Sequence, residues 1–405
     1  MQRRTFMKGA LATTAMGLAN RAFAQGGTLR GVTADQIIIG QTNPYTGPAS
    51  VYAGWSGKVA LAYAEFINAN GGINGRKLKL LSEDDGYQPP RTLEVVRRLV
   101  ERDNVAVVWN TFGTAPSEAI KAYLSGRKVP FLCAGTSAAE KFADPEKYPY
   151  AFPFTASARM EAIILGKFIA KEMGGKKIGI LYQQDDIGEG VRAGLRLGLG
   201  EEAAKLIVSE QAYNISDPTI DSQVLSLRAA GAEIFYNSAT VKHAAQAIKK
   251  ANEIGWDPAT FILNSATGVL KVLSDSQSKP TTTLMTTSYF KSPIDSKWDA
   301  DPAMVEWKKF MADFYPDGDP KEPFCVLTTV NMQCMLHILK ACGDDLTSEN
   351  IIRVATSMKD VELPLLLPGI RLNTSPTDYL PIQELQIVSY KDENWEMVGD
   401  VISAE

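Results

Sequence analysis

Residues 105–133, VAVVWNTFGTAPSEAIKAYLSGRKVPFLC, decide the fold of this chain. Two apolar runs, residues 105–109 and 129–133, flank a segment with apolar residues at helical spacing, residues 115–126. Short buried strands separated by a helix of this length predict a right-handed βαβ unit, in which the two strands run parallel. The loop that joins the first strand to the helix therefore lies at the carboxyl end of that strand.

The same rhythm of strands and helices continues on both sides of this unit. A segment rich in proline and aromatic residues, 147–154, interrupts it and predicts an extended crossing between two α/β lobes. We expect strands at residues 37–39, 78–81, 178–182, 206–213, 234–237, 261–263 and 283–289, and helices at residues 52–70, 89–102, 156–173, 190–199, 219–230, 241–254, 302–314, 326–341 and 348–357. Because ligands bind beyond the carboxyl ends of such strands, two facing sheets predict a binding cleft between the lobes.

The composition counts against several classes of protein. The 405 residues are too many for one compact core and include only two histidines and four cysteines. That shortage disfavours a zinc enzyme, a haem protein or a disulfide scaffold. We expect the cysteines to be buried free thiols, with Cys133 and Cys325 able to pair only if the fold brings them together. A net charge of −4 gives no sign of a nucleic-acid partner.

The N-terminus predicts an export signal. Arg3 and Arg4 are followed by Phe6 and Lys8, then by a weakly apolar run, residues 9–19, and by Ala22-Phe23-Ala24. These elements predict a twin-arginine signal peptide, residues 1–24, cleaved after Ala24, and a mature protein in the periplasm. Without this segment the net charge becomes −8. A disordered N-terminus and a retained membrane anchor are the alternatives, and no other stretch has the length and apolarity of a membrane span.

Glycine and hydroxyl residues follow two neighbouring strands of the first lobe. Residues 110–117 hold Thr111, Gly113, Thr114 and Ser117, and residues 134–138 hold Gly135, Thr136 and Ser137. A helix that begins in such a loop offers free backbone amides and the positive end of its dipole, which suits a carboxylate. The alternative is a pair of ordinary helix caps. Tyr52 and Trp55 would either line the cleft or pack in the core.

The sequence contains none of the common enzyme motifs. It has no G-x-S-x-G, H-E-x-x-H or P-loop pattern. The glycines of residues 188–194 are not spaced as in a dinucleotide-binding loop, so this segment predicts the start of a helix. Asp185-Asp186 is either a carboxylate pair for acid–base chemistry or a solvated loop. We therefore expect no enzyme, and no catalytic residue, metal or cofactor.

Several segments, taken in order, resemble the periplasmic substrate-binding proteins of branched-chain amino acid ABC transporters, the Leu/Ile/Val-binding type. They are Ile37-x-Ile39-Gly40, Thr46-Gly47-Pro48, Gly72-Ile73-Asn74-Gly75-Arg76-Lys77-Leu78, Asp84-Asp85, Gly113-Thr114, Gly135-Thr136-Ser137 and Gly188-Glu189-Gly190. The resemblance covers nearly all of residues 30–400. It implies an α/β fold of two Rossmann-like lobes with parallel-rich sheets, joined by a three-stranded hinge and separated by a cleft.

The resemblance also implies how the chain divides between the lobes. Crossings would fall near residues 150–154, 285–289 and 363–368. Residues 28–151 with 286–363 would form lobe 1, and residues 152–285 with 364–405 would form lobe 2. The family's disulfide positions fall on Tyr87 and Gly113, so both cysteines are absent together.

Ligand-binding residues follow from the resemblance position by position. The family's acid for a ligand ammonium falls near Ser265, and its lobe 2 tyrosine falls on Ile187. Since a buried ammonium without a carboxylate partner is strongly unfavourable, either Asp185 or Asp186 replaces that acid or the ligand lacks an ammonium. The candidate ligand-binding residues are Tyr52, Thr114, Gly135, Thr136, Ser137, Asp186, Thr240 and Ser265.

These residues lead to a hypothesis about function. We expect an extracytoplasmic binding protein that captures a small organic acid with an apolar body, or a branched-chain amino acid, and docks to the membrane permease of an ABC transporter. A ligand sensor with the same fold is the alternative. An exported enzyme is a further one, and it would need a cofactor motif or a nucleophile–base pair that the sequence does not show.

Overall fold

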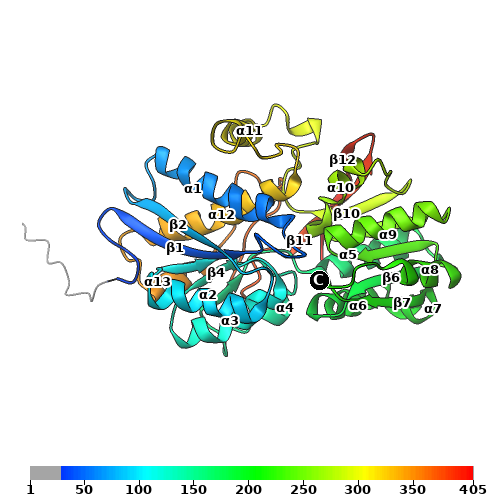
Figure 1. The fold of residues 1–405 in the computed structure, drawn as a ribbon, viewed down its shortest axis with the longest axis horizontal. Coiled ribbons are helices and arrows are strands. Elements are labelled where there is room, and N and C mark those ends of the chain that lie inside the picture. Colours follow the sequence, from blue (N-terminus) through cyan, green and yellow to red (C-terminus); the bar gives the residue numbers. More distant parts are fainter. Residues whose placement is uncertain (1–28, 405) are drawn as a thin grey trace, which may run out of the picture.

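The computed structural model describes residues 29–404, which form two α/β lobes lying side by side (Figure 1). The predicted signal peptide and its cleavage point after Ala24 lie outside the described residues. Each lobe is built on one sheet whose strands alternate with helices along the chain. The expected fold class, two Rossmann-like α/β lobes, is therefore confirmed.

Lobe 1 contains a five-stranded sheet in the order β2-β1-β3-β4-β5, in which all neighbouring strands are parallel. Helices α11, α12 and α13 come from much later in the chain and return to pack in this lobe, α11 and α12 against α1. The strands are β1 Gln36–Asn43, β2 Lys77–Asp84, β3 Val107–Trp109, β4 Phe131–Ala134 and β5 Ala151–Pro153, and the helices are α1 Val59–Ala69, α2 Pro89–Glu101, α3 Thr114–Gly126, α4 Ala139–Phe142, α11 Pro302–Phe314, α12 Pro323–Ala341 and α13 Ser348–Ala355.

Lobe 2 contains a seven-stranded sheet in the order β12-β11-β10-β9-β8-β6-β7. Its β6–β10 strands pair in parallel, and the C-terminal hairpin β11–β12 adds to β10 in antiparallel fashion. The strands are β6 Ile178–Gln183, β7 Ile207–Tyr213, β8 Ile234–Ser238, β9 Ala259–Ile262, β10 Leu284–Ser288, β11 Glu384–Lys391 and β12 Asn394–Ser403, and the helices are α5 Ala158–Glu172, α6 Asp186–Leu199, α7 Ala203–Leu206, α8 Asp221–Ala229, α9 Val241–Glu253 and α10 Val269–Asp275.

Chain segments far apart in sequence meet where the lobes join. Phe290 and Leu366 form an antiparallel bridge, and the backbone N–H of Leu367 donates to the carbonyl of Tyr289 at 3.0 Å. The buried ammonium of Lys291 holds these segments by donating to Asp301 at 2.7 Å and to the carbonyl of Pro364 at 2.9 Å. We propose residues 28–151 with 286–363 as lobe 1 and residues 152–285 with 364–405 as lobe 2.

The glycines of α6 serve close packing between helices. A Cβ atom at Gly194 would lie 2.3 Å from the carbonyl oxygen of Arg159, and one at Gly198 would lie 2.2 Å from that of Ile163. Both carbonyls belong to α5, so glycine lets the two helix backbones touch. The interpretation of residues 188–194 as a helix start is confirmed, because α6 begins at Asp186.

One expectation about membrane spans needs correction. Helix α12 is long and apolar enough to cross a membrane, although 78% of its most apolar 18-residue stretch is buried inside the protein. Helix α12 packs against α1, α13 and β4, so its apolar surface is explained by the core of lobe 1. Composition alone could not separate a helix buried on all sides from a membrane span.

The four cysteines are free and buried, as expected. The fold brings Cys133 to Cys334, within hydrogen-bonding reach, and not to Cys325. Burial raises the pKa of the Cys133 thiol well above its usual range, so this thiol stays protonated near neutral pH.

Candidate functional site

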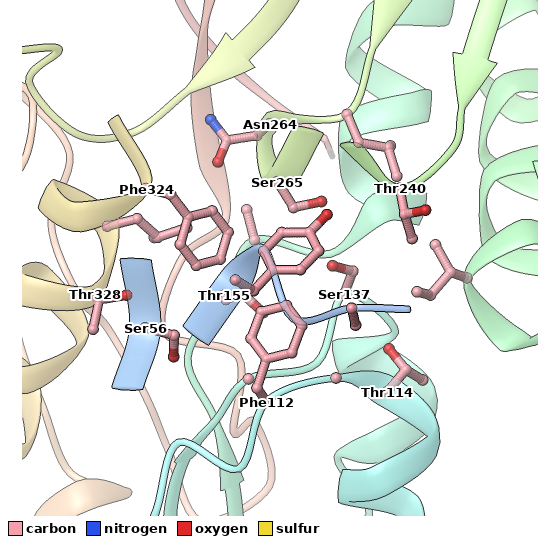
Figure 2. A pocket seen from close by; sticks show the side chains of 18 of the residues that line it. Ser56, Phe112, Thr114, Ser137, Thr155, Thr240, Asn264, Ser265, Phe324 and Thr328 are labelled. Atoms are coloured by element: carbon pink, nitrogen blue, oxygen red, sulfur yellow. The ribbon is translucent and has the colours of Figure 1, made fainter. Parts of the chain in front are cut away.

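A cavity lies between the two lobes, at the carboxyl ends of the strands. It holds roughly 930 Å³ of space free of protein atoms, a volume that includes solvent at its open mouth. Aromatic rings and small polar side chains surround it (Figure 2). From lobe 1 it is lined by Ala49, Tyr52, Ser56, Tyr87, Asn110, Phe112, Gly113, Thr114, Gly135, Ser137, Phe324, Leu327, Thr328 and Asn331, and from the hinge and lobe 2 by Thr155, Ala156, Glu161, Gln183, Ile187, Ile215, Ser238, Ala239, Thr240, Leu263, Asn264, Ser265 and Tyr289.

Helix α3 presents an open N-terminus to this cavity. Its cap residue is Gly113, which has no side chain to accept from the first backbone amides and adopts a φ of 101°. The backbone N–H groups of Thr114 and Ala115 lie in the first turn, where an α-helix leaves its donors without intrahelical partners. A carboxylate is the natural acceptor for such donors, because the positive end of the helix dipole faces it.

Glycine at position 113 is required by its surroundings as well as by its φ. A Cβ atom there would lie 2.3 Å from the ring of Tyr87. Tyr87 and Gly113 are thus in contact, at the two positions where the resemblance placed the family's absent disulfide. The Tyr87 ring fills the space beside the backbone of Gly113.

The loop after β4 completes the lobe 1 face. The backbone N–H of Gly113 donates to the carbonyl of Gly135 at 2.9 Å, which holds the two loops together. Gly135 and Ser137 line the cavity, but Thr136 does not. The Thr136 hydroxyl is fully buried, lies 3.1 Å from the Thr114 hydroxyl and accepts from the backbone N–H of Ala138 at 3.1 Å. Thr136 therefore shapes the loop, and Thr114, Gly135 and Ser137 face the cavity.

Tyr52 lies in the cavity wall, as one of the two sequence interpretations allowed. Its ring contacts Phe112, Phe324 and Trp55, with centroids 4.6, 5.5 and 5.6 Å away. A π-helical turn, η1 Ala53–Lys58, follows it directly and precedes α1. Its hydroxyl accepts a hydrogen bond from the backbone N–H of Val241 in lobe 2, at 3.1 Å. Burial raises the pKa of Tyr52 to about 12, so the phenol remains neutral.

Helix α9 of lobe 2 also points its N-terminus toward the cleft, but tyrosine hydroxyls cover its first two N–H groups. The backbone N–H of Thr240 donates to the hydroxyl of Tyr213 at 2.9 Å, and that of Val241 donates to Tyr52. Thr240 and Ser265 line the cavity through small hydroxyl side chains, as predicted. Ser238 adds a further hydroxyl, which is buried and has no hydrogen-bond partner among the described residues.

The structure does not place Asp186 in the cavity wall. Its carboxylate pairs instead with the ammonium of Lys141 on lobe 1, and neither residue lines the cavity. Asp185 is not a loop acid either, because its side chain caps α6 by accepting from the backbone N–H groups of Ile187 at 3.0 Å and Gly188 at 3.2 Å. Helix capping and an ion pair across the cleft account for this acidic pair.

Sequence reasoning missed Glu161, the one carboxyl among the described residues that line the cavity. Glu161 lies in the first turn of α5 and is 3% exposed. Burial raises its pKa from the usual 4.5 to about 7, although hydrogen bonds from Asn264 and Thr287 act in the opposite direction. The sequence did hold one sign that this carboxyl is buried, because Glu161 stands among apolar residues in Met160-Glu161-Ala162-Ile163-Ile164.

No metal site accompanies these groups in the described part of the chain, residues 29–404. Nowhere in it do three or more His, Cys, Asp or Glu side chains come together as ligands for a metal ion. The cavity is built instead from backbone amides, hydroxyls, amide side chains, aromatic rings and one carboxyl. Groups of these kinds bind and orient a small molecule.

Known proteins share this sequence pattern. A model of the periplasmic binding protein family matches residues 36–394. The chain belongs to the periplasmic binding protein family. An amino acid binding protein of Pseudomonas aeruginosa is 26% identical over 63% of this chain, and Leu/Ile/Val-binding protein homolog 7 of Brucella suis biovar 1 is 27% identical over 56%. These matches span 65% and 58% of the relatives' own lengths, less than two thirds. The resemblance to the Leu/Ile/Val-binding type is confirmed.

Solved structures of periplasmic binding proteins share the fold over most of its length. A branched-chain amino acid ABC transporter protein from Thermus thermophilus with bound valine has a TM-score of 0.79 at 16% identity, covering 92% of this chain and 97% of that one. A fatty acid ABC transporter substrate-binding protein from Thermomonospora curvata has a TM-score of 0.75 at 20% identity, covering 92% and 94%. At such identities the likeness establishes the fold alone.

Proposed function

We propose that this protein is an extracytoplasmic solute-binding protein that captures a small carboxylate-bearing ligand between its lobes and delivers it to the permease of an ABC transporter. The ligand class includes branched-chain amino acids and related aromatic or aliphatic organic acids. The observation that carries the proposal is the open N-terminus of α3, which faces a largely apolar cavity between the lobes.

The cavity has two parts that suit such a ligand. Thr114, Gly135 and Ser137 surround the carboxylate position with hydroxyls and backbone amides, without a basic side chain. Tyr52, Phe112 and Phe324 supply apolar surface in the other walls, which suits a hydrophobic body. Two proteins with this fold are a fatty acid ABC transporter substrate-binding protein and a branched-chain amino acid ABC transporter protein with bound valine, and both fatty acids and valine carry a carboxylate.

Location and partner belong to the same proposal. Members of the family act in the periplasm, and we propose that residues 1–24 direct export and that cleavage follows Ala24. The proposed partner is a membrane permease that recognises the closed form of the two lobes. Deleting the gene should abolish uptake of any radiolabelled compound that the purified protein binds, whereas a sensor of the same fold would leave uptake intact.

Ligand-induced stabilisation tests the ligand class. We would measure the melting temperature with leucine, phenylalanine, 4-methylpentanoate and 3-phenylpropanoate, with 4-methylpentanamide as a neutral control. A bound ligand at about 100 times its Kd stabilises the protein by about 2.7 kcal/mol, which raises the melting temperature by several degrees. Stabilisation by the amide and by none of the four carboxylates would overturn the proposal.

A further inference from the structure

We propose, on the basis of the proposed function, that Glu161 binds the ligand in its protonated form as a hydrogen-bond donor, so that the ligand is an organic anion without an ammonium group and its capture takes up a proton. Glu161 lies on the lobe 2 side of the cavity, and α3 provides the carboxylate site on the lobe 1 side. The two sites together would select ligands by charge as well as by shape.

The hydrogen bonds of Glu161 indicate where its proton lies. Oε2 accepts from the backbone N–H of Asn264 at 2.8 Å and from the hydroxyl of Thr287 at 3.0 Å. Oε1 accepts no hydrogen bond from any of the described residues. A carboxylic acid in this setting keeps its carbonyl oxygen on the two fixed donors and carries its proton on Oε1, the oxygen left for a ligand.

The charges around Glu161 favour the neutral form. No Lys, Arg or His is among the described residues that line the cavity, so no protein cation compensates an ionised Glu161. The titratable groups that face it are the phenols of Tyr236, from β8, and Tyr289, after β10, and burial raises the pKa of both far above neutrality. Burial also raises the pKa of Glu161 itself to about 7.

A ligand carboxylate on α3 adds a second negative charge to the same enclosed space. Like charges at short range in low dielectric disfavour each other, so ligand binding raises the pKa of Glu161 further. Where Glu161 is ionised in the free protein, binding therefore takes up one proton from solvent, which enters on Oε1. The other lobe 2 side chains at the cavity, Ser238, Thr240 and Ser265, are neutral hydroxyls and supply no counter-charge for an ammonium.

The experiment measures affinity by calorimetry at pH 6, 7 and 8, using 4-methyl-2-oxopentanoate and 3-phenyl-2-oxopropanoate, whose ketone oxygen can accept from Glu161, and their amino acid counterparts, leucine and phenylalanine. We expect the acids to bind more tightly than the amino acids, and the affinity for the acids to fall about ten-fold from pH 6 to pH 8. The variant Glu161→Gln keeps an N–H donor at this position, so it should bind the acids with little pH dependence. Glu172→Gln, at the other end of α5 and exposed, should behave like the wild type.

The opposite pattern would overturn the proposal. If Glu161 pairs with an ammonium as a carboxylate, leucine or phenylalanine binds best, affinity rises with pH, and Glu161→Gln abolishes binding. If none of the four probes binds the wild type, the ligand class of the proposed function is wrong. The protonation of Glu161 is then tested by a measurement on the unliganded protein.

The unliganded protein provides that measurement. A carboxyl whose pKa is raised in the folded state stabilises the fold least at high pH, because the unfolded chain releases the proton first. The melting temperature of the wild type should therefore fall, relative to that of Glu161→Gln, as pH rises from about 4.5 to above 7. Parallel pH profiles for the wild type, Glu161→Gln and Glu172→Gln would show that folding does not raise the pKa of Glu161 and would overturn the proposal.

Discussion

The two lobes direct a helix N-terminus at the same cavity and treat it in opposite ways. In lobe 1, Gly113 leaves the first amides of α3 open to a ligand. In lobe 2, the hydroxyls of Tyr52 and Tyr213 occupy the first amides of α9, and a buried acid, Glu161, faces the space instead. The lobe 1 side of the cavity is thus better suited to an anion than the lobe 2 side.

This difference gives the ligand an orientation. A carboxylate gains donors and a favourable dipole on α3, whereas near Glu161 it meets either a negative charge or a single hydrogen-bond donor. The rest of the ligand must then lie against the aromatic wall and lobe 2. The same substitution should therefore change ligand affinity by different amounts on the two faces.

The largest effect is expected from Ser137→Asp, which places a carboxylate on the anion-binding face. Repulsion of a ligand carboxylate costs several kcal/mol, so the affinity for 4-methylpentanoate should fall about 100-fold or more. The fold should tolerate the change, because the structural contact of Ser137 is made by its backbone carbonyl, which accepts from the N–H of Ala158 at 2.7 Å. Isothermal calorimetry provides the measurement, and circular dichroism checks folding.

The matched control is Ser265→Asp, the same change on the lobe 2 face. We expect a loss of affinity below about ten-fold, since the added charge lies away from α3 and is more weakly coupled to the ligand carboxylate. Equal losses for the two variants would mean that the faces do not differ in the way proposed.

Particular residues show what the sequence could and could not predict. The strands and helices follow from local periodicity, and the loops after β3 and β4 follow from their position at strand ends, so Thr114, Gly135 and Ser137 were placed at the cavity. Glu161 was not found, because the partners that define its environment, Asn264 and Thr287, are 103 and 126 residues away in the chain.

Residues that were wrongly assigned to the site have the same explanation, which is a partner far away in the sequence. Asp186 was predicted to bind ligand because an ammonium needs a carboxylate partner and the family's acid position falls near Ser265, which is not an acid. Its partner, Lys141, lies 45 residues earlier in the other lobe, and pairing between the lobes is invisible to periodicity. The short helices α4 and α10 were also missed, since four and seven residues are too few for a clear helical pattern.

A smaller effect is expected from Tyr52→Phe, which uncovers an amide of α9. The lost hydrogen bond leaves the backbone N–H of Val241 without an acceptor in a buried position, at a cost of about 1–3 kcal/mol. Because Tyr52 and Val241 belong to different lobes, this cost falls on the closed form, and ligand affinity should drop about five- to 100-fold.

Tyr213→Phe is the control for that prediction. It uncovers the neighbouring N–H of Thr240, but both residues lie in lobe 2, so the bond persists whether the lobes are open or closed. We expect a comparable decrease in melting temperature and a smaller change in affinity. If both variants changed affinity equally, the hydrogen bond of Tyr52 would not be specific to closure.

The smallest effect is expected from Lys141→Met, which removes the ion pair between the two faces at the edge of the cleft. The Lys141 side chain is 60% exposed and that of Asp186 is 29% exposed, so solvent screens the attraction, and such pairs contribute about 0–1 kcal/mol. Ligand affinity should decrease less than about five-fold at low salt, and the difference from the wild type should vanish near 1 M salt, where the Debye length is about 3 Å. Lys147→Met is the matched control, because the Lys147 ammonium lies over the ring of Tyr148 within lobe 1. A salt-independent loss for Lys141→Met, or an equal loss for Lys147→Met, would show that the pair does not act by electrostatic attraction between the lobes.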